Sequence, residues 1–361
     1  MRVSASPGSQ AAVSVATKME TVTATMVLSL WRALGVTFGA GFALCLPAQQ
    51  LKLSTDPWIA WAPAQIAADH GFWQQRGVTV VLHSYADGDS VQAFVAKQAD
   101  FGLMMAGTAI GLQASGQADV VVLAEVDWSH GGDKMVGKKG KSLAELKGKR
   151  IGIYEDSPAV MMFLAAKLKA EGLRIADFKV VVVEDMDSLA SQFLAGRLAC
   201  AISYDPYVAK ATANGACEVI ATTADFPGVM PEVLVAHREV LARIPPGQVA
   251  ALLAGWIDAV EWSVDPLNEA AFAKLCATRV FATEKVSVES IPELLKNVRI
   301  HGPNELRERN LTAAGLETFL RECARFAART GKVDVARMFD RKPLERALEL
   351  RSTTPAAAPA K

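Results

Sequence analysis

From Leu51 onward, short apolar runs rich in β-branched residues alternate with segments whose apolar residues recur every three to four positions. The short runs predict strands and the periodic segments predict helices, in the alternation typical of a parallel sheet covered by helices. The expected strands are residues 51–54, 78–83, 101–105, 120–124, 150–154, 179–183, 198–204, 218–222 and 233–237. After residue 237 the pattern is helical, over 247–263, 269–278, 290–296 and 313–330.

Two polar stretches divide this pattern into parts. At 361 residues the chain exceeds the usual size of a single core, so two lobes are expected. The first break, at 127–141, is rich in Gly and Lys, and the second is the turn at 225–231. We predict a first lobe made of residues 49–137 and 231–345, the latter part mostly helical, and a second lobe of residues 138–230. The last residues, 346–361, are predicted to form a disordered tail.

The N-terminal residues have the pattern of a secretory signal. Arg32 precedes the apolar run 33–46, and Pro47-Ala48 supplies a break and a small residue at which a peptidase can cut. The run is short for a membrane-spanning helix, although a non-cleaved anchor remains an alternative. Cys45 raises the possibility of lipidation, but the bulky Leu44 before it does not fit a lipoprotein signal. We interpret residues 1–48 as a signal peptide with an N-terminal extension and expect a periplasmic protein.

Composition and motifs argue against several classes of function. With 38 basic and 38 acidic residues the net charge is zero, which gives no field to attract nucleic acid. Ser129-His130 has triad residue types beside acids, but adjacent side chains point apart and cannot pair a nucleophile with its base. Gly140-Lys141-Ser142 ends like a phosphate-binding loop but lacks the required earlier glycine, because Met135 occupies that position. The few histidines form no metal motif, so we expect no catalytic residue, metal or cofactor.

Candidate ligand-binding residues follow the predicted strands, because ligands of open α/β sheets bind beyond the carboxyl ends of strands. The candidates are Asp56, Trp58, Trp61, Gly107, Thr108, Asp127, Trp128, Asp133, Glu155, Ser157, Glu184, Tyr204 and Asp205. If the two lobes face each other, these loops line one cleft.

Acidic residues outnumber basic ones in these loops, where His130 and Lys134 are the basic candidates. A buried carboxylate disfavours an anionic ligand, so the pattern predicts an amine, a guanidine-like group or an aminopyrimidine between aromatic walls. Some acids are expected to serve as caps instead, with Asp187 capping the helix at 188–195. One anion alternative remains, in which the helix starts at Thr108 and Ser157 hold a small oxyanion.

Four stretches together resemble the nitrate/sulfonate/taurine-type solute-binding proteins of ABC transporters, the group that also contains thiamine-pyrimidine-precursor binders. These stretches are Pro63-Ala-Gln-Ile-Ala-Ala-Asp-His-Gly-Phe-Trp73, Ala99-Asp-Phe-Gly102 with its following loop, Ser142-Leu-Ala-Glu-Leu-Lys-Gly-Lys-Arg-Ile-Gly152, and Leu194-Ala-Gly-Arg-Leu-Ala-Cys-Ala-Ile-Ser-Tyr-Asp-Pro-Tyr207. The resemblance covers roughly residues 50–335. In the last stretch this chain departs from the family pattern, because Cys200 replaces the usual acidic residue and the aromatic residue is displaced to Tyr204.

The resemblance implies an α/β fold of the periplasmic-binding-protein type II, a clamshell whose two lobes have mainly parallel sheets and close on a ligand in the cleft between them. It implies the substrate-binding component of an ABC importer, acting on a small nitrogen- or sulfur-containing solute. The partners would be the permease and ATPase subunits in the inner membrane, and the protein itself would be a monomer. The alternative is an enzyme on the same fold, of the pyrimidine-synthase or menaquinone-pathway type, which the export pattern and the missing catalytic motifs disfavour.

Export is testable by direct measurement of the mature N-terminus. Because the small residue Ala48 follows the apolar run, mass spectrometry of periplasmic protein should place the first residue within a few positions of Gln49. A chain that retained Met1 or Met26 in the cytosol would contradict the prediction.

Overall fold

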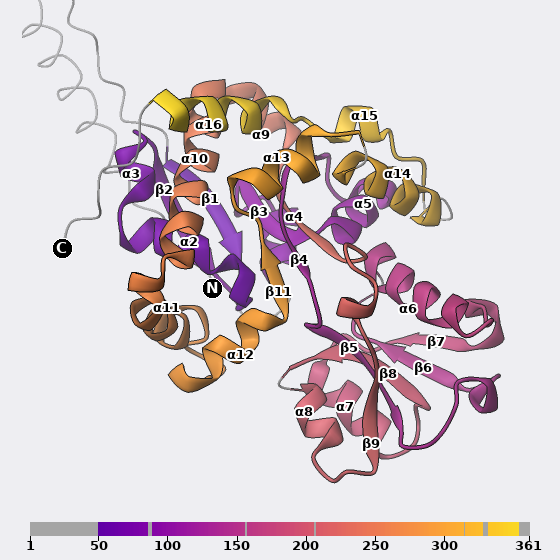
Figure 1. Cartoon of the computed structure of the whole chain (residues 1–361). Helices are drawn as coiled ribbons and strands as arrows, with labels where there is room; N and C mark the ends of the chain where they lie inside the picture. The colour runs from indigo at the N-terminus through magenta and orange to yellow at the C-terminus, as the bar shows by residue number, and fades with distance from the viewer. Residues whose placement is uncertain are drawn as a thin grey trace, which may run out of the picture. The chain divides into compact units, whose positions relative to one another are not determined.

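The protein is represented by a computed structural model that describes residues 50–85, 89–155, 157–205, 207–313, 315–327 and 331–353 (Figure 1). The predicted signal peptide lies outside the described residues. Two β-sheets, each with its own helices, make up the described part of the chain. This architecture is mixed α/β, as the alternating pattern predicted.

Among the described residues, the first sheet has six strands in the order β11-β4-β10-β3-β1-β2. They are β1 (Gln50–Thr55), β2 (Thr79–Ser84), β3 (Phe101–Met105), β4 (Val120–Ser129), β10 (Pro231–His237) and β11 (Val298–Ile300). Strands β4 and β10 lie in the middle of the order and are buried along nearly their whole length. They therefore read as continuous apolar runs rather than as alternating ones.

The second sheet, counted over the described residues, has five strands in the order β7-β6-β8-β5-β9. They are β5 (Asp133–Lys138), β6 (Arg150–Ile153), β7 (Lys179–Val182), β8 (Cys200–Tyr204) and β9 (Cys217–Thr222). Strand β5 lies within the stretch read from the sequence as a polar break. It forms because β8 and β9 pair with it on both sides, a tertiary contact that residue pattern does not reveal.

The helices follow the same division. Helices from the segments of the first sheet are η2 (Ile59–Trp61), α2 (Ala62–Asp69), α3 (Phe72–Gln75), α4 (Asp89–Val95), α5 (Ala106–Ser115), α9 (Arg238–Arg243), α10 (Pro246–Val264), η6 (Pro266–Asn268), α11 (Glu269–Leu275), η7 (Cys276–Val280), η8 (Val288–Ser290), α12 (Ile291–Lys296), α13 (Pro303–Leu311), α14 (Leu316–Phe326), α15 (Val335–Met338) and α16 (Lys342–Thr353). Those of the second are η3 (Ala144–Leu146), α6 (Pro158–Ala170), η4 (Ile175–Asp177), α7 (Met186–Leu194), α8 (Tyr207–Thr212) and η5 (Thr223–Asp225). Within the described parts of the chain, no helix combines the length and apolar character needed to cross a membrane.

The expectation of mainly parallel sheets is wrong, because both sheets are mixed. The pairings β1–β2, β1–β3, β6–β7 and β6–β8 are parallel. The pairings β10–β3, β10–β4, β11–β4, β5–β8 and β5–β9 are antiparallel. The cause lies in the two connections between the sheets, from β4 to β5 and from β9 to β10. Strand β4 runs out of the first sheet and β10 runs back into it, while β5 runs into the second sheet and β9 runs out of it, so the partners in each sheet run in opposite directions.

Three helices join the two sheets on one side. Helix α6 packs against α5 and α14, which come from the segments of the first sheet (Figure 1). One apolar cluster runs through this contact and includes Met104 of β3, Phe163 of α6 and Leu320 of α14. The sheets therefore share buried apolar surface, which stabilises their arrangement by the hydrophobic effect.

Residues 346–353, predicted to be disordered, are helical, because α16 continues to Thr353, and the rest of the predicted tail lies outside the described residues. Leu344 and Leu348 of this helix are buried, and the helix packs along α10. These two leucines are four residues apart, a spacing that predicts a helix with one buried face. The Ala- and Pro-rich sequence that follows them led to the prediction of disorder instead.

A buried ion pair fastens α16 to the rest of the fold. Asp258 of α10 has a side chain that is 1% exposed and accepts hydrogen bonds from Arg76 Nε at 2.6 Å and Arg351 Nε at 2.7 Å. The Arg76 side chain is itself 6% exposed. One carboxylate therefore connects α3, α10 and α16.

Replacing this carboxylate should destabilise the protein strongly. Asp258→Ala removes the anion that Arg76 and Arg351 share in a largely buried site, although Arg351 keeps its contact with Glu261. Breaking such a buried pair costs about 3–5 kcal/mol of unfolding free energy. Urea unfolding measures the loss. Glu261→Ala is the matched control, because Glu261 also pairs with Arg351 but is half exposed, so its loss should stay within about 1 kcal/mol. Equal losses for the two variants would contradict this assignment.

Candidate functional site

A cavity of about 560 Å³ opens at the carboxyl ends of strands from both sheets, and we refer to it as the central cavity. Its size is within the range of small-molecule sites. Its lining residues are Asp56, Pro57, Trp58, Trp61, Asp89, Val91, Gln92, Met104, Met105, Thr108, Asp133, Tyr154, Glu155, Glu184, Asp185, Met186, Asp187, Tyr204, Tyr207 and Glu232. They lie at or just after the carboxyl ends of β1, β3, β6, β7 and β8, on the first turns of α4, α5, α7 and α8, or in the first two residues of β5 and β10.

The structure brings most of the residues predicted from sequence to this one cavity. The predicted residues in its lining are Asp56, Trp58, Trp61, Thr108, Asp133, Glu155, Glu184 and Tyr204. The predicted residues outside its lining are Gly107, Asp127, Trp128, Ser157 and Asp205. Strand-end position therefore located the cavity, whereas side-chain direction decided which residues reach it.

The residues outside the lining other than Asp127 have contacts elsewhere. Trp128 packs against Arg309, whose guanidinium carbon lies 4.8 Å from the ring centre, and edge-on against His301. Asp205 pairs with Lys134 at 2.5 Å and accepts from the backbone N–H of Ala209 at the start of α8. These two residues stabilise the walls from outside.

Gly107 and Ser157 meet where α5 and α6 begin. Ser157 caps α6 by accepting from Ala159 N at 3.3 Å, followed by Pro158 as the sequence predicted. A Cβ atom added to Gly107 would lie 2.3 Å from Ala159 N and 2.7 Å from Ser157 Oγ. The two helix starts are therefore packed directly against each other, and only a glycine fits between them.

Aromatic rings form the walls of the central cavity. Tyr154 and Tyr204 make an edge-on contact with ring centres 5.2 Å apart, and Tyr204 and Tyr207 make another at 6.0 Å. On the other side, Trp58 packs so closely on Gly132 that a Cβ there would lie 2.7 Å from its ring. These walls suit a flat or positively charged ligand.

The charge of the lining is entirely negative. Among the described lining residues eight are acidic, and none is Lys, Arg or His. The acids are Asp56, Asp89, Asp133, Glu155, Glu184, Asp185, Asp187 and Glu232. Glu184, Asp185 and Asp187 are exposed at the rim, whereas Asp133 and Glu232 are 4% and 5% exposed.

Glu155 lies between the two sheets. It accepts a hydrogen bond of 2.6 Å from the hydroxyl of Thr108 on α5. Burial raises the pKa of Glu155 to about 7, and the neighbouring carboxyls of Asp133 and Asp56 contribute to the rise, while the Thr108 bond opposes it. Near neutral pH this carboxyl therefore changes charge readily and responds to a nearby positive charge.

Asp133 is the innermost acid on the second sheet. Burial raises its pKa, and the hydroxyl of Tyr154 opposes the rise by donating a hydrogen bond of 2.6 Å. Burial also raises the pKa of Tyr154 well above its usual value, so the phenol keeps its proton and remains a donor. Its second contact is with the Met105 sulfur, 3.6 Å away.

Several acids are held by local contacts. Asp56 accepts from Ser90 N at 3.0 Å and Ser90 Oγ at 2.6 Å, which fixes the loop after β1 against α4. The expectation that Asp187 caps α7 is wrong, because Asp185 is the cap and accepts from Ser188 N. Asp187 pairs with Lys210 instead. The cap lies two residues earlier because α7 begins at Met186.

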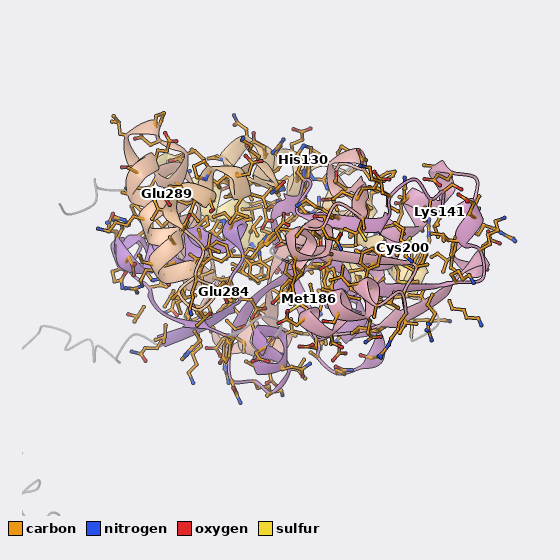
Figure 2. All side chains as sticks on the ribbon, turned by 90° about the horizontal axis from the view of Figure 1, so that it is seen from below. His130, Lys141, Met186, Cys200, Glu284 and Glu289 are labelled. Carbon is orange, nitrogen blue, oxygen red and sulfur yellow. The ribbon has the colours of Figure 1, made fainter. Side chains whose placement is uncertain are left out.

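The sequence analysis missed part of the lining. Glu232, Tyr154, Tyr207 and the methionines at 104, 105 and 186 all reach the central cavity. Glu232 is the second residue of β10, whose sequence is otherwise typical of a buried strand. An acidic residue at the start of such an apolar run was the signal that could have identified it. Met186 lies near the middle of the view in Figure 2, whereas Lys141 lies near one end, which leaves the Gly140-Lys141-Ser142 turn away from the cavity.

Ser129, one of the residues whose type suggested a catalytic triad, makes structural contacts where the chain passes between the two sheets. Ser129 Oγ hydrogen-bonds Thr223 Oγ1 at 2.8 Å and accepts from Asp133 N at 3.0 Å. These bonds join the two connections between the sheets. Ser129 is fully buried, which does not suit a nucleophile.

The class of protein follows from this architecture and its comparisons. The fold is that of the periplasmic binding proteins. The nitrate-binding protein of Synechocystis PCC 6803 superposes with a TM-score of 0.66 at 14% identity, covering 87% of this chain and 93% of that one. The aliphatic sulphonate binding protein of Escherichia coli superposes with a TM-score of 0.63 at 17% identity, covering 80% and 97%.

Residues 46–277 match the model of the NMT1-like family, and the chain belongs to that family. The family resemblance inferred from the four sequence stretches is thereby confirmed. A relative from Brucella abortus (strain 2308), named as a candidate binding protein, is 31% identical over 185 residues. That match covers 50% of this chain and 56% of the relative, so the chain spans about half the length of this relative. Relative and neighbours alike are named as binding proteins.

The close contact at Gly107 can be tested by adding one methyl group. Gly107→Ala should lower the unfolding free energy by about 1–3 kcal/mol, because the new Cβ overlaps the backbone of α6 and forces α5 away from it. Gly111→Ala on the same helix is the matched control, since its Cβ would meet Pro158 at an ordinary 3.8 Å. There alanine should stabilise the helix by about 0.5–1 kcal/mol. Urea unfolding distinguishes the two, and a stabilising Gly107→Ala would contradict the packing.

Proposed function

We propose that the chain is the exported binding component of an ABC importer, and that its ligand is a small organic cation such as an amine, a guanidine-like compound or an aminopyrimidine. The observation that carries the proposal is the lining of the central cavity, with eight carboxyls and no described basic side chain. A ligand that supplies positive charge and N–H donors would satisfy these acceptors.

The geometry of the inner acids favours one ligand end deep in the cavity. Asp133, Glu155 and Glu232 come from three different segments and converge behind the aromatic walls. Trp58 and Tyr204 stand on opposite lobes, so a flat ligand can lie between them. Cation–π contacts of this kind contribute about 0.5–2 kcal/mol each.

An anionic ligand is disfavoured, although the structural neighbours are named for nitrate and sulphonate. An anion would face the acids without a described basic residue in the lining, at a cost of several kcal/mol. The alternative oxyanion site between the starts of α5 and α6 also lacks room, because Gly107 and Ala159 are in direct contact there.

Location and partners follow from the same proposal. A binding component of this kind works in the periplasm as a monomer and delivers its ligand to the permease and ATPase subunits of the inner membrane. The predicted signal peptide and the fold shared with periplasmic binding proteins support this placement.

A ligand screen tests the charge assignment. Calorimetry at pH 8 should detect binding of a cation such as benzamidinium or agmatine, or of the neutral N–H donor 4-aminopyrimidine, and no binding of taurine, methanesulfonate or nitrate. Glu155→Gln should weaken the bound cation by about 1–3 kcal/mol, because it removes a charge-assisted acceptor inside the cavity.

Glu289→Gln is the control for that variant, because Glu289 is exposed on η8 and lies away from Met186 in Figure 2. It should leave the affinity unchanged. Micromolar binding of an anion with no cation bound would overturn the proposed ligand class.

A further inference from the structure

Two carboxyls face each other beneath the central cavity. Glu232 of β10 and Asp127 of β4 are direct partners in the antiparallel β4–β10 pairing. They are 5% and 0% exposed. Side chains directly opposite on neighbouring strands lie within contact distance, and two like charges in that position repel. Glu232 reaches the cavity and Asp127 lies behind it.

The pair lacks the hydrogen bonds that buried charges require. Among the described residues, Glu232 Oε2 and both carboxylate oxygens of Asp127 have no well-formed hydrogen-bond partner. The indole N–H groups of Trp58 and Trp61 are close enough to lower the pKa of Asp127, yet neither makes a well-formed bond. Buried polar groups in native proteins are nearly always hydrogen-bonded, so an unsatisfied pair of carboxyls indicates a missing partner.

The surrounding elements add negative charge to the pair. Burial raises the pKa of Asp127 well above its usual value, and Glu125 on the same strand raises it further. Burial likewise raises the pKa of Glu232, with Asp127 and Asp133 of β5 adding to the rise.

Among the described residues, the nearby basic side chains are bonded elsewhere, and Lys134 of β5 pairs with Asp205. On β3, Met105 stands opposite Glu232, and on β11, Ile300 stands opposite Asp127. The nearby bases His301 and Arg309 are both bonded to Glu125. Arg299 of β11 is exposed and donates to backbone carbonyls.

We propose that Asp127 and Glu232 hold one proton between them in the empty protein and release it when a positively charged ligand enters the central cavity. This inference rests on the proposed function. The ligand's positive charge replaces the proton, which passes to solvent, and the pair changes from one negative charge to two. Glu232 then interacts with the positive charge of the ligand, and the proximity of Asp127 determines how readily Glu232 loses its proton.

In the absence of ligand, the carboxyl pair should lower the unfolding free energy of the protein at high pH. A carboxyl whose pKa is raised by folding binds more protons in the folded than in the unfolded state, so stability falls as pH rises from the ordinary carboxyl range through the raised value. Glu232→Gln removes that penalty. Its melting temperature should exceed that of the wild type by about 2–4 °C at pH 8, with no gain at pH 5.

A second variant separates a shared proton from two independent acids. Asp127→Asn should give the same gain at pH 8, and the double variant should gain less than the sum of both, because either change alone relieves the same repulsion. Glu322→Gln, at an exposed position of α14, is the control and should show no pH-dependent gain. Additive gains, or a loss that is equal at pH 5 and pH 8, would overturn the inference.

Calorimetry with benzamidinium chloride completes the test without relying on stability. Repeating the titration at pH 8, where Glu155 with its pKa of about 7 is already mostly ionised, in two buffers of different ionisation enthalpy counts the protons released. The count should be about one for the wild type and fewer for Glu232→Gln. Binding without proton release overturns the shared proton and leaves the proposed function standing. If benzamidinium and the other cations fail to bind while the pH 8 gain is non-additive, the carboxyl pair stands and the proposed ligand class fails.

Discussion

The fold depends on a chain that crosses between two sheets twice within a small space. Ser129 and Thr223, one from each crossing, are joined by a hydroxyl–hydroxyl bond of 2.8 Å, and Thr223 also accepts from Gly131 N at 2.8 Å. Because these atoms are buried, each bond replaces water that the crossing segments have lost. The crossings in turn account for the mixed strand directions and for the position of the central cavity beside them.

The buried acids of the cavity lie at these same crossings. Asp127 is near the end of β4, Asp133 begins β5 and Glu232 is near the start of β10. Asp127 and Glu232 belong to the first sheet and Asp133 to the second, so the acids at the crossings come from both sheets. Placing acids at this point costs stability, a cost that binding sites commonly carry in exchange for function.

The sequence predicted the alternation of strands and helices, the family and most loops of the site, because these depend on local pattern and strand-end position. It could not predict β5, which owes its existence to pairing with β8 and β9. Nor could it place Glu232 in the lining of the cavity with Asp127 beside it outside the lining, because the pairing of these two residues across β4 and β10 is a tertiary contact. Side-chain direction and partners are tertiary properties, and residue order alone contains little of either.

Glu125 shows what this protein does with a buried carboxylate that serves structure. It lies two residues before Asp127 on β4 and is equally buried. Arg309 donates to it through two nitrogens, at 2.8 and 3.0 Å, and His301 Nε2 lies 3.0 Å from it. The same strand thus contains one carboxylate with a full set of partners and another with none well formed. Glu125 and Asp127 lie on the same buried strand. The missing partners of Asp127 and Glu232 therefore reflect their position at the cavity and not a general lack of basic residues in this part of the fold. This difference supports the proposal that a positively charged ligand is the missing partner.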